Sequence, residues 1–176
     1  MPDTSSSIVA KASPWVLQHS HLIPAGGHVL DLACGNGRHT RHLQAQSFKV
    51  VASDKDLSGV LDLAGSRGVE LLQTDLEAED WPFSAGQFDG IIVTNYLYRP
   101  HFPQIVDSLA RNGVLIFETF AAGNEKYGRP RNPAYLLNPD ELLHAFGDSL
   151  NVVSFEQAED RVPHPAVRQR ICARRN

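Results

Sequence analysis

Short apolar segments alternate with helix-like segments along most of this chain. The apolar segments span residues 28–34, 49–53, 69–74, 88–95 and 114–119, and each of the first three is followed directly by glycine or aspartate. Strands that alternate with helices form a parallel sheet covered on both faces, joined by right-handed crossovers. The sequence therefore predicts an α/β three-layer sandwich whose ligands bind at the carboxyl ends of the strands.

Two of the predicted helices have clear boundary signals. Ser13-Pro14 offers an N-cap followed by proline, which predicts a helix that reaches about Leu22. Asn138 begins a similar pattern as an N-cap, and Gly147 is expected to end that helix.

The remaining helices are predicted from apolar spacing and stop signals. A helix is expected over residues 38–47. Residues 57–64 carry apolar side chains at i, i+3, i+4 and i+7, which predicts an amphipathic helix. The helix that begins near Phe102 is expected to stop at Asn112-Gly113, before the fifth strand.

Two further strand-like stretches, residues 151–155 and 166–173, are separated by a Pro-His-Pro segment. This pattern predicts a hairpin, and thus an antiparallel edge on a mostly parallel sheet. Alternation along the second stretch places Arg168 and Arg170 on one face. We interpret these arginines as protection of an exposed edge strand, with contact to RNA as the alternative.

Composition narrows the possible classes of protein. The 176 residues suit one domain, so we treat residues 1–176 as a single domain with an N-terminal arm and helix over 1–24. A formal charge of −4 gives no general reason for binding a phosphate backbone. The apolar runs are far shorter than the roughly 20 residues of a membrane span. We therefore expect a cytoplasmic monomer or homodimer that contacts neither membrane nor nucleic acid.

The potential metal ligands do not form a site in the sequence. His39 and His42 lie three apart on a predicted helix, but no third ligand is spaced with them. Cys34 and Cys172 are also not spaced as metal ligands. We therefore expect no bound metal.

The segment VLDLACGNGRH, residues 29–39, is the strongest functional motif. Its Gly-x-Gly turn after a strand allows a ligand to approach the backbone closely. A nicotinamide site requires a third glycine, where this chain has Thr40, and Asp31 would repel a pyrophosphate group. S-adenosylmethionine has no phosphate and carries two cationic groups, so an acid near the turn suits it better.

With Asp31 four residues before Gly35, and with Gly37 completing the turn, the chain resembles the class I S-adenosylmethionine-dependent methyltransferases. The resemblance extends over nearly the whole chain and implies a Rossmann-like, seven-stranded, mostly parallel sheet with an antiparallel last strand. The sequence CGNGR is similar to that of small bacterial methyltransferases of the tellurite-resistance type.

The resemblance also implies roles for acids at successive strand ends. Asp54 matches the acid that binds the ribose hydroxyls, and Asp75 matches the position that accepts from the adenine amino group, with Leu76 beside the ring. In full, the implied cofactor-binding residues are Asp31, Ala33, Gly35, Gly37, Asp54, Lys55, Asp75, Leu76 and Asn95.

Residues 95–101 follow the fourth strand, where such enzymes place groups beside the reactive methyl. The segment lacks the paired prolines typical of amino-group methylation of nucleic acid bases, so that reaction is disfavoured. No catalytic residue is assigned, but Tyr96 and His101 are candidates, and Tyr98 and Arg99 are candidates for substrate contact. Simple packing is the alternative for the two tyrosines.

Residues 121–135 form a long segment rich in glycine, proline and charge, and loops of this length in compact domains are often functional. Tyr127, Arg129, Arg131 and Tyr135 would form a lid that suits an anionic or planar acceptor. A solvated connecting loop is the alternative.

Together these features predict an enzyme that uses S-adenosylmethionine to methylate a small molecule by in-line transfer. The alternatives are a methyltransferase of RNA or protein, and a non-catalytic protein that binds S-adenosylmethionine.

Overall fold

The computed structural model describes residues 10–162 and 164–176. Its α-helices are α1 (Pro14–His19), α2 (Arg38–Ala45), α3 (Phe102–Ser108) and α4 (Glu141–Phe146). Its strands are β1 (His28–Leu32), β2 (Lys49–Asp54), β3 (Val69–Gln73), β4 (Phe88–Thr94), β5 (Leu109–Phe120), β6 (Asn151–Asp160) and β7 (Ala166–Arg174). Short 3₁₀ segments cover Ser20–Leu22, Ser58–Leu63, Arg99–His101, Asn124–Lys126 and Pro133–Tyr135.

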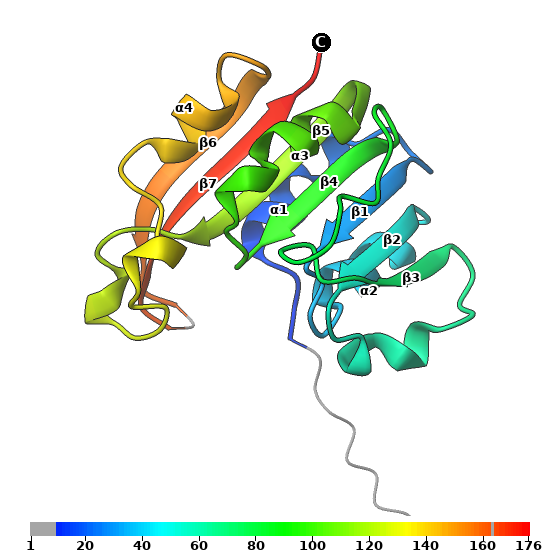
Figure 1. Cartoon of the computed structure of the whole chain (residues 1–176), viewed down its shortest axis with the longest axis horizontal. Coiled ribbons are helices and arrows are strands. Elements are labelled where there is room, and N and C mark those ends of the chain that lie inside the picture. The colour runs from blue at the N-terminus through cyan, green and yellow to red at the C-terminus, as the bar shows by residue number, and fades with distance from the viewer. Residues whose placement is uncertain (1–9, 163) are drawn as a thin grey trace, which may run out of the picture.

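All seven strands join one sheet in the order β3-β2-β1-β4-β5-β7-β6 (Figure 1). Neighbours from β3 to β5 pair in parallel, whereas β7 pairs antiparallel with both β5 and β6. The predicted α/β class, with its mostly parallel sheet and antiparallel last strand, is confirmed. Because the chain order reverses at β1 and β4, the carboxyl ends of these strands border the crevice in which such folds bind ligands.

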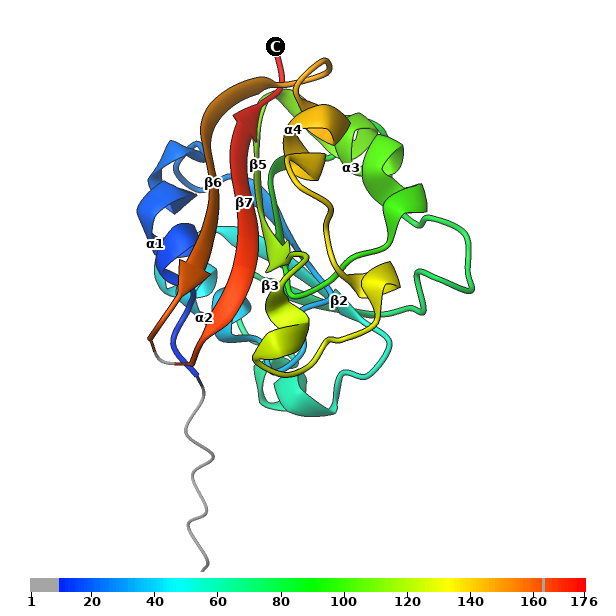
Figure 2. The same ribbon diagram turned by 90° about the vertical axis from the view of Figure 1, so that its left-hand side faces the viewer.

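Helices cover both faces of the sheet, with α1 and α2 on one side and α3 and α4 on the other (Figure 2). Alternate residues of the central strands point to the two layers: Val29 and Ile92 pack with α1 and α2, whereas Leu30 and Ile91 pack with the opposite layer. Strands buried on both faces need apolar residues at every position, which explains the continuous apolar runs in the sequence.

The helix boundaries at Ser13 and Gly147 are confirmed. Ser13 Oγ accepts a hydrogen bond from the N–H of Val16 at 3.2 Å, and Gly147 is the C-cap of α4. Within residues 10–162 and 164–176, no helix combines the length and the apolar character that crossing a membrane requires.

The helix predicted over residues 57–64 is wrong, because this segment forms a 3₁₀ helix at Ser58–Leu63. Leu57, Val60 and Leu63 face a small apolar cluster, whereas Leu61 is 61% exposed. Their spacing of three matches the 3₁₀ repeat, in which residues i and i+3 align. The α-helical interpretation placed Leu61 on the wrong face.

The helix stop predicted at Asn112-Gly113 is also wrong. Helix α3 ends at Ser108, and Leu109 already pairs with Phe88 of β4. The two predicted stop residues lie inside β5, where its register with β4 shifts. A Cβ atom at Gly113 would lie 2.8 Å from the carbonyl oxygen of Ala110, so glycine here permits a bulge rather than ending a helix.

The start predicted for α4 is two residues early. Asp140, with a φ of 57°, is the N-cap, and its side chain makes no capping hydrogen bond. The carbonyl of Asn138 instead accepts from Nε2 of Gln169 on β7 at 2.8 Å. This contact holds Asn138 against the sheet, so the helix begins only after it.

The interpretation of the second C-terminal stretch as an edge strand is wrong. Strand β7 lies between β5 and β6, and the edge strand is β6, which is twice as long as the predicted 151–155. Arg168 and Arg170 therefore lie on an interior strand, where they protect no edge.

Candidate functional site

The turn between β1 and α2 has a backbone that favours small residues. Ala33, Gly35 and Gly37 have φ of 55°, 53° and 69°, in the left-handed region. A Cβ atom at Gly37 would lie 2.4 Å from Cγ1 of Val60, so a larger residue does not fit. At Gly35 such an atom would meet nothing within 4 Å. The backbone at Gly35 is therefore open to the approach of a ligand.

Asp54 joins this turn to the end of β2. Its Oδ2 accepts a hydrogen bond from the N–H of Gly35 at 2.8 Å, and its Oδ1 accepts from the N–H of Asp56 at 3.1 Å. A backbone bond from Cys34 to the carbonyl of Ser53, at 2.9 Å, adds a second link. These bonds hold the Asp54 carboxylate beside the glycine turn.

Asp31, on β1, is buried, with 1% of its surface exposed. Its Oδ2 accepts from Oγ1 of Thr40 at 2.6 Å, which connects β1 to α2. Burial raises the pKa of the Asp31 carboxyl to about 6, although the bond from Thr40 opposes the rise. Asp31 therefore supports the turn from beneath.

A cavity of about 280 Å³, here called the acidic cavity, opens at the carboxyl ends of β1 to β4. Carboxylates outnumber ammonium groups three to one among its lining residues, so a cationic ligand suits it better than a phosphate. Six of its nine lining residues are among the expected cofactor-binding residues. The lining residues are Ala33, Asp54, Lys55, Thr74, Asp75, Leu76, Glu77, Asn95 and Tyr96.

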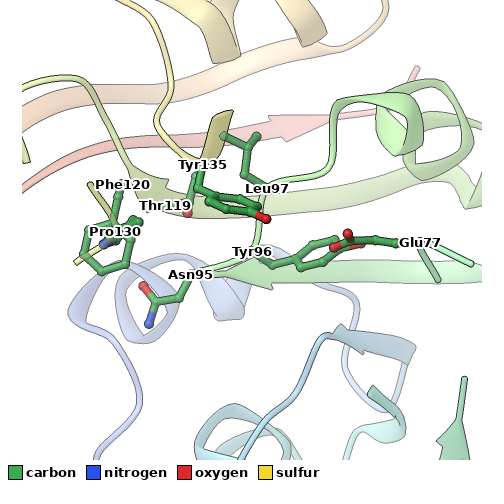
Figure 3. A pocket seen from close by; sticks show the side chains of 8 residues that line it. All are labelled: Glu77, Asn95, Tyr96, Leu97, Thr119, Phe120, Pro130 and Tyr135. Carbon is green, nitrogen blue, oxygen red and sulfur yellow. The ribbon is translucent and has the colours of Figure 1, made fainter. Parts of the chain in front are cut away.

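A second cavity of about 280 Å³, here called the aromatic cavity, adjoins the first (Figure 3). Its walls come from the segment after β3, the end of β4, the end of β5 and the loop 121–135. Glu77, Asn95 and Tyr96 line both cavities. The other lining residues are Leu97, Thr119, Phe120, Pro130 and Tyr135.

Asn95 and Tyr96 form the border between the two cavities. Asn95 has a φ of 55°, and its Oδ1 accepts from Nη1 of Arg168 at 2.6 Å. The Tyr96 hydroxyl is buried and has no hydrogen-bond partner in the described part of the chain. Burial raises the pKa of this hydroxyl, and the charge of Glu77 adds to the rise. Tyr96 is therefore protonated at neutral pH and offers a hydrogen bond to a ligand.

The fold is similar to those of several solved structures. TehB from Haemophilus influenzae superimposes with a TM-score of 0.77 at 14% identity, over 96% of this chain and 63% of that chain. An S-adenosylmethionine-dependent methyltransferase from Methanosarcina mazei gives 0.70 at 16% identity, over 94% and 99%. The 1,6-didemethyltoxoflavin-N1-methyltransferase of Burkholderia thailandensis, with bound S-adenosylhomocysteine, gives 0.69 at 19% identity, over 92% and 76%. At these identities the similarity concerns the fold.

Residues 29–112 match a family model described as a methyltransferase domain. This segment contains the glycine turn and all the residues that line the acidic cavity. Residues 29–112 are thus similar to a methyltransferase domain, and the chain has the fold of S-adenosylmethionine-dependent methyltransferases.

Curated relatives match this chain over part of their length. An uncharacterized protein of Mycobacterium tuberculosis is 32% identical over 111 residues, which cover 61% of this chain and 40% of the relative. The tRNA U34 carboxymethyltransferase of Methylococcus capsulatus is 30% identical over 139 residues, which cover 67% and 42%. The chain thus spans about two fifths of the length of these relatives.

His101, a predicted catalytic candidate, lines neither cavity. It is 5% exposed, and its Nε2 lies 2.7 Å from the carbonyl oxygen of Leu76 while its Nδ1 lies 3.2 Å from Oε1 of Gln104. Its ring packs between those of Trp81 and Tyr98. Both ring nitrogens are occupied, so His101 positions Leu76 rather than serving as a free base.

Tyr98 and Arg99, predicted to contact substrate, also lie outside both cavities. The Arg99 guanidinium donates to Glu141 on α4 through Nε at 2.6 Å and Nη2 at 2.9 Å. Its Nη1 and Nη2 also donate to the carbonyls of Ala134 and Leu136 at 2.8 and 2.9 Å. Arg99 thereby anchors the end of the loop 121–135.

The loop 121–135 contributes Pro130 and Tyr135 to the aromatic cavity, but not the other predicted lid residues. Tyr127, Arg129 and Arg131 are exposed, and none of them lines either cavity. The ammonium of Lys126 lies 4.8 Å from the centre of the Tyr127 ring. The loop therefore presents an aromatic and a proline side chain to the cavity, while its cations point elsewhere.

The arginines of β7 are engaged with carboxylates. Arg170, whose side chain is 9% exposed, contacts Glu118 on β5 and both Glu156 and Asp160 on β6. The Arg168 guanidinium lies over the Phe120 ring at 4.1 Å. This arrangement replaces the predicted edge protection with a partly buried ionic cluster.

His39, near the glycine turn, has structural contacts. His39 Nε2 accepts from the N–H of Ser13 at 3.2 Å, and its Nδ1 lies 3.3 Å from Oγ1 of Thr94. Burial lowers the pKa of His39 to about 3, so this ring is neutral. Among the residues that the structure describes, no group of three or more His, Cys, Asp or Glu could hold a metal.

Sequence reasoning missed several residues of the aromatic cavity, namely Glu77, Leu97, Thr119, Phe120 and Pro130. Thr119 and Phe120 end β5, so the rule that ligands bind at strand ends contained the necessary signal. Glu77 lies two residues after Asp75, in a loop whose path the sequence does not determine.

Proposed function

We propose that this chain is a methyltransferase that binds S-adenosylmethionine in the acidic cavity and a small-molecule acceptor in the aromatic cavity. The observation that carries the proposal is that the two cavities share Glu77, Asn95 and Tyr96. Ligands that occupy both cavities would therefore meet at this border, as direct transfer between two molecules requires.

The acidic cavity fits the chemistry of the donor. Its carboxylates suit a ligand with a sulfonium and an ammonium group and disfavour pyrophosphate. Asp54 would accept from the ribose hydroxyls, Asp75 from the adenine amino group, and Leu76 would pack against the ring. The open backbone at Gly35 would allow close approach of the methionine portion. When bound, the donor supplies an activated methyl group.

The work of the chain would be alignment and exclusion of water. Apolar walls such as Leu97 and Phe120 would hold the acceptor, and the Tyr96 hydroxyl would orient a ligand at the border. Such positioning and desolvation together lower a barrier by several kcal/mol. An acceptor atom that already carries a free lone pair needs no base, which agrees with the occupied ring nitrogens of His101.

Methylation of RNA is the second candidate, because the Methylococcus capsulatus relative is a tRNA U34 carboxymethyltransferase. Two observations favour the small molecule. Arg168 and Arg170, the cations on which contact with RNA would rest, bind carboxylates of β5 and β6. The Burkholderia thailandensis enzyme of similar fold is named for a small acceptor, 1,6-didemethyltoxoflavin.

The test is to incubate the purified chain with S-adenosylmethionine labelled in the methyl group and with a cell extract separated into small molecules, RNA and protein. We expect label in the small-molecule fraction, and its loss with Asp54→Ala. Label in RNA would show that the acceptor is RNA and not a small molecule. Donor binding without transfer to any fraction would favour a non-catalytic binding protein.

A further inference from the structure

The walls of the aromatic cavity are flat and apolar on several sides. Tyr96 from the end of β4, Phe120 from the end of β5 and Tyr135 from the loop 121–135 supply aromatic rings. Leu97 and Pro130 add apolar surface between them. Aromatic side chains that line a small cavity favour planar ring systems, which stack on or against them.

The polar groups at this cavity are acceptors or neutral. Glu77 is the charged residue among its eight lining residues, and no lysine or arginine is present in that set. Figure 3 shows Glu77 beside Tyr96, whose hydroxyl has no partner in the described residues. Because a carboxylate only accepts hydrogen bonds, Glu77 suits an N–H donor and repels an anion.

Arg168 contacts these walls but is not among the residues that line the cavity. The Arg168 guanidinium lies over the Phe120 ring, donates to Asn95 Oδ1 and lies 3.4 Å from Asp160. It therefore contacts two lining residues, Phe120 and Asn95, and its charge is paired with Asp160. A bound anion would have no cationic partner within the lining set.

We propose that the acceptor is a small planar aromatic molecule, neutral or cationic, that donates an N–H hydrogen bond to Glu77. This inference rests on the proposed function, because it assigns the aromatic cavity to the acceptor. The predicted lid suited an anionic or planar acceptor, and the proposal keeps the planar alternative and departs from the anionic one. A cavity of about 280 Å³ is at the lower limit of typical ligand sites, so it suits one or two fused rings.

Three probes of nearly equal shape test the charge preference: benzamidine, benzamide and benzoate, which are cationic, neutral and anionic at neutral pH. Their binding is measured by ligand-observed NMR on the full chain saturated with S-adenosylhomocysteine. We expect benzamidine to bind best and benzoate worst, with a ratio of about tenfold or more, since charged hydrogen bonds contribute about that factor. Benzoate binding as tightly as benzamidine, or no binding of any probe, would overturn the inference.

Glu77→Gln removes the charge but keeps the shape of the side chain. We expect the preference for benzamidine over benzoate to fall to about twofold or less in this variant, because the electrostatic difference is lost. Glu70→Gln is the matched control, since Glu70 is exposed on β3 and lines neither cavity. A preference that survives in Glu77→Gln, or disappears equally in Glu70→Gln, would overturn the role of Glu77.

Calorimetric titration with S-adenosylhomocysteine separates this inference from the proposed function. We expect Glu77→Gln to weaken binding of this product much less than it weakens binding of benzamidine, because Asp54 and Asp75, which would bind the ribose and the adenine, remain in the acidic cavity. A loss equal to the loss for benzamidine would assign Glu77 to donor binding and overturn the inference alone. Failure of the unmodified chain to bind S-adenosylhomocysteine would overturn the proposed function.

Discussion

The acidic and aromatic cavities adjoin each other, yet the chain builds them in different ways. Residues of the acidic cavity lie at or just after the ends of consecutive parallel strands, as Ala33, Asp54 and Asp75 do. The aromatic cavity instead depends on the loop that carries Tyr135 and on the contact of β7 with Asn95. The first is held by local turns, whereas the second depends on tertiary contacts between distant segments.

The largest expected effect concerns the ionic cluster that Arg170 forms with Glu118, Glu156 and Asp160. Arg170→Met leaves Glu118, whose side chain is 4% exposed, without its cation. We expect the free energy of unfolding to fall by about 3–5 kcal/mol, the cost of an uncompensated buried charge. Denaturant unfolding measures it. Lys126→Met is the control, because its pair with Glu159 is exposed and screened by solvent, so its loss should change stability little. Equal losses would contradict the account of the cluster.

For the acidic cavity, a substitution in the glycine turn tests how tightly the turn is packed. Gly37→Ala places a Cβ atom 2.4 Å from Val60 at a φ of 69°, so we expect a loss of stability of about 2–4 kcal/mol. Gly26→Ala, at a φ of 70° and with nothing within 4 Å, should cost only about 1 kcal/mol. Thermal unfolding of both variants distinguishes crowding from backbone strain. Similar decreases in melting temperature in both variants would show that the Val60 side chain moves aside at little energetic cost.

A pH series tests the support that Asp31 gives to this turn. The pKa of its carboxyl rises from 3.8 to about 6 on folding, so the folded chain binds more protons than the unfolded chain between these values. The contribution of Asp31 to stability should therefore fall as pH rises from about 4 to about 6, by about 1–3 kcal/mol, and then stay constant. Asp31→Asn should remove this fall. Parallel stability curves for the two chains across this window would contradict the burial argument.

The smallest expected effect is on benzamidine binding, and it distinguishes two tyrosines of the loop 121–135. Tyr135 lines the aromatic cavity, whereas Tyr127 does not. We expect Tyr135→Ala to weaken benzamidine binding by about 1 kcal/mol, typical of a lost aromatic contact, and Tyr127→Ala to leave it unchanged. Titration in the presence of S-adenosylhomocysteine measures both. A greater loss in the Tyr127 variant would restore the original lid prediction.

The parallel half of the molecule could be predicted because its signals are local. Each strand from β1 to β5 appears as an apolar run, and Asp54 and Asp75 directly follow two of them. The spacing of apolar residues predicted the wrong type of helix where an α-helix and a 3₁₀ helix fit the same positions. Leu57 and Val60 are three apart in both an α-helix and a 3₁₀ helix, and only packing against the glycine turn decides between them.

Strand order and side-chain partners could not be read from the sequence in the other half. Nothing near Arg168 and Arg170 indicates that β7 inserts between β5 and β6, since this order depends on pairing between distant segments. The same holds for Arg99, whose partner Glu141 lies 42 residues away. In both cases, arginines that we expected at an exposed edge or in contact with substrate bind other parts of the fold instead.

The central claim, that the acidic cavity binds the methyl donor, is tested most directly by calorimetric titration of the full chain with S-adenosylhomocysteine and with NAD. The account predicts micromolar affinity for the first, much weaker binding of the second, and a loss of about 1–3 kcal/mol for S-adenosylhomocysteine in Asp54→Ala. Asp80→Ala, an exposed acid outside both cavities, should have no effect. Tighter binding of NAD, or an unchanged affinity in Asp54→Ala, would contradict the account.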